Sequence, residues 1–100
     1  MKSGNSIKVI RKKFKISQTE LAEKSGISQT YLSQIEHEVK NPSIKIIEQV
    51  GQSLNVPLPI LLWFTLEKND VPEEKRDIYD KIKPIIDNLI EELFNIHPNV

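Results

Sequence analysis

The side chains that could carry out catalysis are few, and their spacing matches no known catalytic set. The chain has no cysteine and two histidines, which are too few for an ordinary zinc site. No serine–histidine–acid set and no phosphate-binding glycine loop stands out. His37 lies between Glu36 and Glu38, but neighbours on a helix point about 100° apart and cannot share a metal ion. The sequence therefore predicts neither an enzyme nor a metal or cofactor site.

Amide and hydroxyl side chains suited to hydrogen bonding are instead concentrated between residues 28 and 34. They are Ser28, Gln29, Thr30, Ser33 and Gln34. Glutamine presents a donor and an acceptor side by side, and a hydroxyl can act as either. The apolar residues Leu32 and Ile35 have the spacing of one helix face. A helix here would keep that face on a core and leave the polar groups free to bind a partner.

Two short helices must position these groups. Ser17-Gln18-Thr19-Glu20 is a capping-box pattern that predicts a helix start. Gly26 ends this helix, because a tight turn requires a left-handed backbone that glycine adopts at least cost. Ala22 is small enough for the close approach of two steeply crossing helices, and Ser28 caps the second helix. The spacing predicts a helix-turn-helix over residues 18–36.

Apolar residues recur at spacings of three and four along the chain without strand alternation, so we predict an all-α fold. The expected helices cover residues 5–15, 18–25, 28–38, 44–54, 58–67 and 73–95. Pro84 lies inside the last pattern and should kink or restart that helix. We divide the chain into a five-helix unit at 5–67, which contains the helix-turn-helix, and a C-terminal helical extension at 70–96.

These motifs resemble the lambda-type phage repressor and Cro family, also called xenobiotic response element (XRE) regulators. The resemblance is carried by residues 17–22, 28–36 and Asn41-Pro42-Ser43, and it extends from about Ile7 to Leu66. It implies a five-helix lambda-repressor-like domain that binds operator DNA, usually as a dimer, and regulates transcription. Lys15 and Glu38 stand where many members have glycine. We therefore expect the turns at these two positions to differ in shape.

The resemblance implies a role for each polar group, because the second helix of such a motif enters the major groove. Base readout is expected from Ser28, Gln29, Thr30, Ser33 and Gln34. Gln29 is the first choice, since glutamine can accept from N6 and donate to N7 of adenine. Phosphate contacts are expected from Gln18, Lys40, Asn41, Ser43 and Lys45. Arg11 and Glu36 match positions that form an ion pair in this family, so Arg11 is expected to be structural.

Charge is segregated along the chain although the net charge is zero. The first forty residues hold eight bases and four acids, whereas residues 70–100 hold four bases and eight acids. A polyanion such as double-stranded DNA would be attracted to the first part and repelled by the last. The absence of cysteine suits the cytoplasm, and the most apolar stretch, residues 56–66, is too short to span a bilayer.

The last two predicted helices carry more apolar surface than one core requires. We predict a two-fold homodimer whose interface contains Leu61, Trp63, Phe64, Ile82, Ile86, Leu89 and Leu93, with the acids of the last helix facing solvent. One alternative is that the last helix folds back on its own domain. Another is that the chain is the antitoxin of a toxin–antitoxin pair and that this helix grips the toxin.

Overall fold

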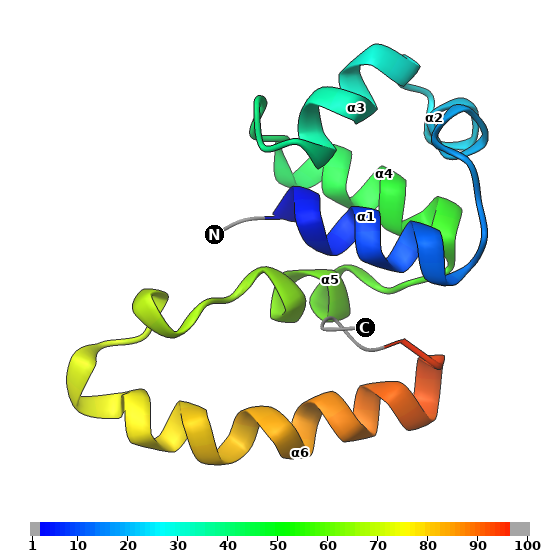
Figure 1. Ribbon diagram of the computed structural model, residues 1–100. Coiled ribbons are helices and arrows are strands. Elements are labelled where there is room, and N and C mark those ends of the chain that lie inside the picture. Colours follow the sequence, from blue (N-terminus) through cyan, green and yellow to red (C-terminus); the bar gives the residue numbers. More distant parts are fainter. Residues whose placement is uncertain (1–2, 97–100) are drawn as a thin grey trace.

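The computed structural model describes residues 3–96, which form six α-helices and two short 3₁₀ turns without a strand. The helices are α1 (Ser3–Lys13), α2 (Gln18–Ser25), α3 (Gln29–Glu36), α4 (Ile44–Leu54), α5 (Leu58–Thr65) and α6 (Arg76–Phe94), and the turns are η1 (Lys68–Asp70) and η2 (Glu73–Lys75). Helices α1 to α4 form one block, α5 lies against it, and α6 lies on the far side of α5 (Figure 1). The all-α prediction is confirmed.

Serine caps set the starts of three helices. The side chain of Ser17 accepts a hydrogen bond from the backbone N–H of Glu20, at 3.0 Å. Ser28 and Ser43 do the same for the third residue beyond them, at 3.0 Å and 3.3 Å. Gly26 ends α2 with a left-handed φ of 71°. The starts predicted from these serines are confirmed, whereas α1 begins two residues earlier than expected.

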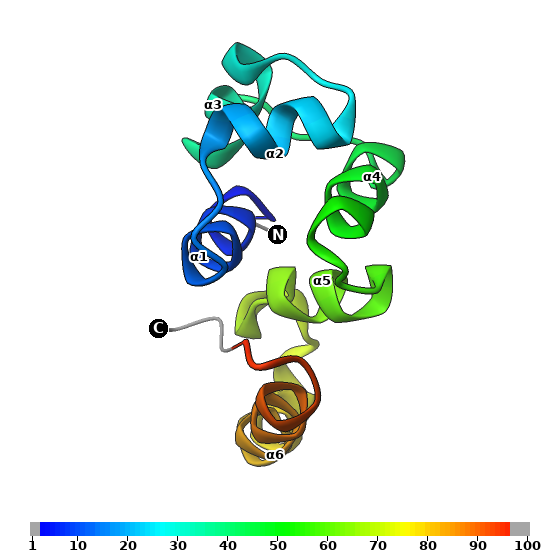
Figure 2. The same ribbon diagram turned by 90° about the vertical axis from the view of Figure 1, so that its right-hand side faces the viewer.

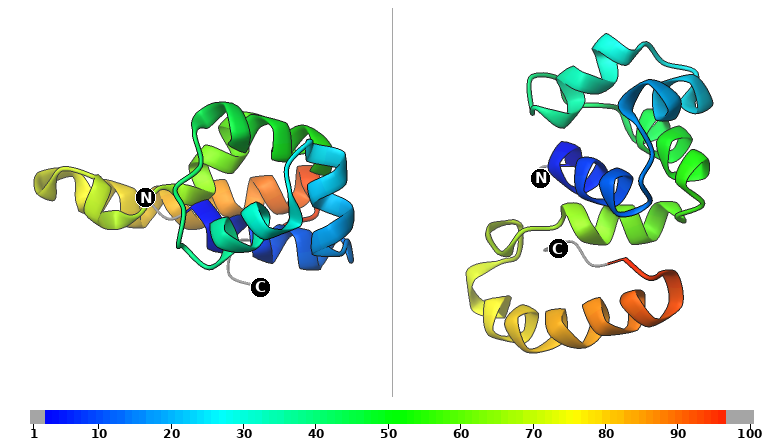
Figure 3. Two further views of the ribbon diagram at one scale, coloured as in Figure 1. Left: turned by 90° about the horizontal axis from the view of Figure 1, so that it is seen from above. Right: turned by 45° about the vertical axis from the view of Figure 1, so that its right-hand side comes forward.

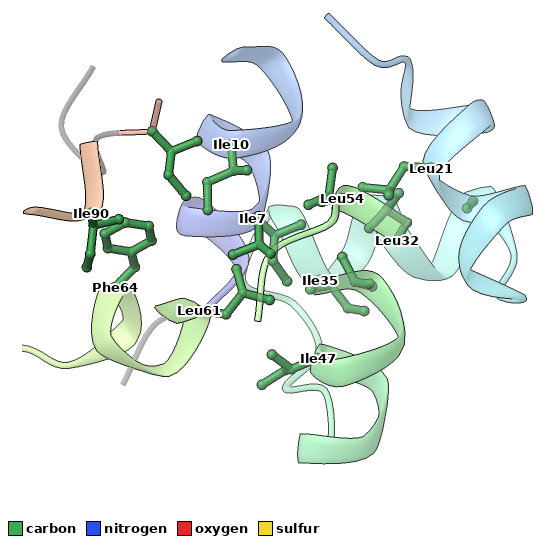
Figure 4. Packing of buried hydrophobic residues seen from close by; sticks show 14 residues of the cluster. Ile7, Ile10, Leu21, Leu32, Ile35, Ile47, Leu54, Leu61, Phe64 and Ile90 are labelled. Carbon is green, nitrogen blue, oxygen red and sulfur yellow. The ribbon is translucent and has the colours of Figure 1, made fainter. Parts of the chain in front are cut away.

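The hydrophobic core joins all six helices. Leu21, Leu32 and Ile35 of the helix-turn-helix are completely buried, and Figure 4 shows them in one cluster with residues of α1, α4, α5 and α6. The predicted interface residues Leu61 and Phe64 are also buried in this core, at 1% and 9% exposure.

The prediction that Leu61 and Phe64 lie in a contact between two copies is therefore wrong. The physical reason is that Leu61 faces α4 at Gly51, while α6 folds back over α5 so that Ile90 covers Phe64 (Figure 4). Figure 2 views α6 end-on, beyond α5 and on the side opposite α2 and α3. Part of the extra apolar surface of the last two helices is thus buried within one chain.

Polar contacts fasten α6 to α5. The indole N–H of Trp63 donates to Asp87 Oδ1 at 2.8 Å, and Lys83 Nζ donates to Asp87 Oδ2 at 2.6 Å. The hydroxyl of Tyr79 donates to the backbone carbonyl of Leu66 at 3.2 Å. Asp87 is 4% exposed. This acid therefore does not face solvent as the sequence had indicated; it anchors the helix.

Helix α6 runs without interruption from Arg76 to Phe94 although it contains Pro84. Figure 3 shows it as one continuous ribbon. The expected restart is absent. Tyr79 before the proline and Asp87 after it both bond to the neighbouring domain, and Pro84 itself is exposed. No helix within residues 3–96 has the length and apolar character that a membrane span requires.

Lys15 and Glu38, which stand where many family members have glycine, keep a backbone conformation that is typical of glycine. Lys15 and Glu38 have φ values of 57° and 61°, in the left-handed region that disfavours side chains. The expected change in shape is therefore absent. At Glu38 a compensation is visible, since its carboxylate accepts from the backbone N–H of Asn5 at 2.9 Å.

Lys15→Gly should raise the free energy of unfolding by about 0.5–1 kcal/mol, because it removes the strain of a left-handed side chain at some cost in unfolded-state entropy. Lys15 is exposed, so little packing is lost. The matched control is Lys15→Ala, which keeps the β-carbon and should give no gain. Urea denaturation measures both, and a less stable glycine variant would contradict the strain at this turn.

Candidate nucleic-acid interface

Helix α3 presents its polar side to solvent at the edge of the molecule farthest from α6 (Figure 1). Its other side is fixed, because Leu32 and Ile35 are 0% exposed. Of the five residues expected to read bases, Ser28, Gln29 and Thr30 are exposed, and Ser33 and Gln34 are half-buried. The structure thus brings these five side chains together along the outer side of one rigidly held helix.

A glycine in α1 allows close packing against the backbone at the end of α3. A β-carbon on Gly4, in α1, would overlap the backbone carbonyl oxygen of Ile35. Only glycine lets the start of α1 approach the end of α3 so closely. No sequence pattern reveals this role of Gly4, because the contact joins residues that are far apart in the chain.

A buried ion pair joins α1 to the end of α3, beside the turn between α1 and α2. Arg11 Nε and Nη2 donate to the two carboxylate oxygens of Glu36 at 2.8 Å and 2.9 Å. The Glu36 side chain is 0% exposed and that of Arg11 is 11% exposed. Arg11 Nη1 also donates to the backbone carbonyl of Ile16 at 2.9 Å. Arg11 is therefore part of the framework and is not free to contact a ligand.

The ion pair continues into two glutamines that reach the surface. Gln18 Nε2 donates to Glu36 Oε1 at 3.1 Å, and Gln29 Nε2 donates to Gln18 Oε1 at 2.6 Å. A carboxylate can only accept, so Glu36 draws the amide N–H of Gln18 and turns its carbonyl toward Gln29. Gln29 must then donate, which leaves its own carbonyl and its second N–H available for a ligand.

The sequence predicts only a phosphate contact for Gln18, whereas the structure also bonds it to Gln29. The two residues are eleven positions apart, so no local pattern links them. The signal that could have revealed the pair is that each is the first residue of its helix. The fold brings their side chains within hydrogen-bond distance.

The expected phosphate-contacting residues beyond α3 are all exposed. Lys40 and Asn41 lie in the loop, and Ser43 and Lys45 lie at the start of α4. The backbone N–H groups of Val39 and Lys40 donate to the carbonyl of Gln34 at 2.8 Å and 3.2 Å. The backbone of this loop is therefore held against the end of α3.

His37 bonds to its own helix. Its Nδ1 lies 2.8 Å from the backbone carbonyl oxygen of Ser33. Within residues 3–96, no group of three or more histidine, cysteine, aspartate or glutamate side chains is placed to hold a metal ion.

Comparisons with known proteins agree with this arrangement. A helix-turn-helix family model matches residues 7–61. The immunity repressor of Bacillus phage phi105 is 33% identical over 93 residues, covering 93% of this chain and 62% of that protein. The transcriptional regulator SinR of Bacillus subtilis is 45% identical over 60 residues, covering 59% of this chain and 54% of that protein.

A solved structure is similar as well. The crystal structure of SinR, the master regulator for biofilm formation, in complex with DNA has 44% sequence identity and a TM-score of 0.57, covering 60% of this chain and 97% of that chain. This chain spans 62% and 54% of the lengths of the two curated relatives. Because the family model covers more than half of the sequence, this chain belongs to the XRE-type helix-turn-helix family, whose members are DNA-binding transcriptional regulators and not enzymes.

Proposed function

We propose that this chain is a sequence-specific transcriptional repressor that acts in the cytoplasm and binds a near-palindromic operator as a homodimer. The observation that carries the proposal is the outer side of α3, where five polar side chains lie exposed or half-buried above a buried apolar side. A helix of this kind can enter the major groove and present its N-terminal residues to base edges.

Gln29 is the proposed principal base-reading residue. Its free carbonyl and remaining N–H can bind N6 and N7 of adenine, and its hydrogen bond to Gln18 limits the rotamers it samples before DNA binds. Ser28, Thr30, Ser33 and Gln34 provide the neighbouring contacts. Lys40, Asn41, Ser43 and Lys45 are proposed to contact phosphates, and Gln18 contributes there through its remaining amide N–H.

The names of the relatives support repression. One is an immunity repressor and another is a transcriptional regulator, and the latter has been solved with DNA. The antitoxin alternative gains no support from these relatives. In a homodimer, two recognition helices would bind half-sites about 34 Å apart, which is one turn of the duplex.

Selection from a random pool of duplex DNA tests the proposal. We expect a near-palindromic consensus, and we expect the logarithm of affinity to fall linearly with that of salt concentration, with a slope of about −0.9 for each phosphate neutralised. Binding measured by fluorescence anisotropy between about 50 and 200 mM salt gives the slope. No enrichment of any sequence, or affinity that ignores salt, would sink the proposal.

Two alanine variants separate base readout from phosphate contact. Gln29→Ala should weaken binding to the preferred site by about 1–3 kcal/mol and relax preference at one base pair of each half-site. Lys45→Ala should weaken binding to all sequences about equally and flatten the salt slope by about 1. The matched control is Gln52→Ala, an exposed glutamine near the other end of α4. An unchanged base preference in Gln29→Ala would contradict this placement of α3.

A further inference from the structure

Helix α6 carries a stripe of exposed apolar side chains that the fold leaves uncovered. The stripe consists of Ile78, Ile82, Ile85, Leu89 and Leu93, which are 51%, 40%, 62%, 57% and 75% exposed. Among residues 3–96, the other exposed large apolar side chains are Val39, in the loop after α3, and Ile44, the first residue of α4. A continuous exposed apolar stripe on one helix is typical of a surface that binds another protein.

The stripe is separate from the side of α6 that packs on its own domain. Asp87 and Ile90 face α5 and are buried. At 3.6 residues per turn, the stripe lies about a third of a turn away from them. Docking on α5 therefore leaves it on the flank of the molecule, accessible from the side.

An apolar pocket adjoins one end of the stripe. It has a volume of about 250 Å³ and is lined by Trp63, Val71, Lys75, Ile78, Tyr79 and Ile82. At the other end of α6 stands Leu93, the most exposed residue of the stripe. One end of the helix thus offers a pocket, and the other end offers a side chain that could fill it.

We infer that α6 pairs antiparallel with α6 of a second copy, so that Leu93 of each copy enters the pocket of the other. The inference rests on the proposed homodimer and identifies its interface. The residues of the stripe are three or four positions apart whichever way the helix is followed. When the second helix runs in the opposite direction, Leu93 therefore lies beside Ile78 of the other copy, and Leu89 lies beside Ile82. Ile85 then lies next to its own counterpart at the two-fold axis.

The position of α3 selects the antiparallel arrangement. Helices α3 and α6 lie on opposite sides of the molecule (Figures 1 and 2). A two-fold axis that runs from α6 toward α3 makes the two α6 helices antiparallel and keeps both α3 helices on one face. A parallel pair has its axis along α6, which would turn one α3 away from DNA. Because an operator is read from one face by both copies, the antiparallel pair fits the function.

Charge favours the same direction. After Pro84, α6 holds the three acids Asp87, Glu91 and Glu92 and no base. Between residues 73 and 83, four bases offset four acids. A parallel pair would bring the two acidic ends together, whereas an antiparallel pair places the exposed acids Glu91 and Glu92 of each copy beside the charge-balanced first half of α6 of the other copy.

Disulfide trapping tests the pairing directly, because the chain has no cysteine of its own. On the full chain at tens of micromolar, Ile85→Cys should cross-link to itself under mild oxidation. Ile78→Cys and Leu93→Cys should each stay uncross-linked alone and should cross-link when mixed. The control is Asp77→Cys, which is exposed on α6 away from the stripe and should not cross-link.

The outcomes separate this interface from the proposed function, because operator binding is measured on the same variants. Cross-linking of Ile78→Cys to itself would overturn the antiparallel arrangement. A dimer in light scattering that binds the operator but gives no cross-link in any variant would overturn this interface alone, whereas a monomer would also contradict the proposed homodimer. As a second measurement, Ile85→Glu should convert the dimer to a monomer with unchanged helical circular dichroism, and a persistent dimer would also contradict the inference.

Discussion

Arg11→Ala should lower the free energy of unfolding by about 3–5 kcal/mol, because it leaves a carboxylate buried without its cation. The Glu36 side chain is 0% exposed, and its remaining side-chain donor is Gln18, at 3.1 Å. One amide N–H cannot replace a bidentate guanidinium. The variant also loses the bond to the carbonyl of Ile16 that closes the turn after α1. Chemical denaturation measures the loss.

Two controls identify the cause as the unpaired buried charge. Lys24→Ala removes an ion pair with Glu20 that is about half exposed, and it should cost at most about 0.5 kcal/mol. The double variant Arg11→Met/Glu36→Leu removes both charges and should recover most of the loss. An Arg11→Ala protein as stable as the Lys24→Ala protein would show that the pair contributes little.

Leu61→Ala should destabilise the fold by about 2–5 kcal/mol, because it creates a cavity in a close-packed core. Leu61 is 1% exposed and packs against the backbone of α4 at Gly51, where a β-carbon would lie 2.7 Å from Leu61 Cδ1. Little rearrangement can fill the space, since the helix backbone there is already in contact. Thermal or urea unfolding gives the value.

Leu61→Met is the matched control, since it conserves volume and should cost less than about 1.5 kcal/mol. Self-association measured by light scattering distinguishes the two possible places for this residue. In the structure Leu61 belongs to the core, so stability should fall while the folded protein still associates. If Leu61→Ala kept its stability but no longer associated, Leu61 would lie in the contact between copies, as the sequence predicted.

Local features of the sequence were sufficient for the elements of this fold. Ser17, Ser28 and Ser43 mark helix starts because each caps a backbone N–H three residues away. The turn at Gly26 follows from its left-handed backbone. By contrast, the left-handed turns at Lys15 and Glu38 could not be predicted, because residue type alone does not reveal that hydrogen bonds around a turn can keep a side chain in that conformation.

Features that depend on distant parts of the chain could not be predicted. The close approaches at Gly4 and Gly51 arise only when helices pack against each other. Apolar residues on α5 can be counted from sequence, but whether α6 or another copy covers them depends on the turn at η1 and η2. The same holds for the candidate site. The spacing of the polar residues predicts its polar face, whereas the bond between Gln18 and Gln29 depends on how two helices pack and could not be predicted.

The position of Trp63 gives the protein a built-in optical probe. It is the sole tryptophan in the sequence, its indole bonds to Asp87 of α6, and its ring lies 6.2 Å from that of Tyr79. Its emission wavelength and the energy transferred from that tyrosine therefore depend on whether α6 remains docked on α5. Because Trp63 also lines the pocket at the end of the stripe, the same unlabelled fluorescence signal should respond when that pocket is filled.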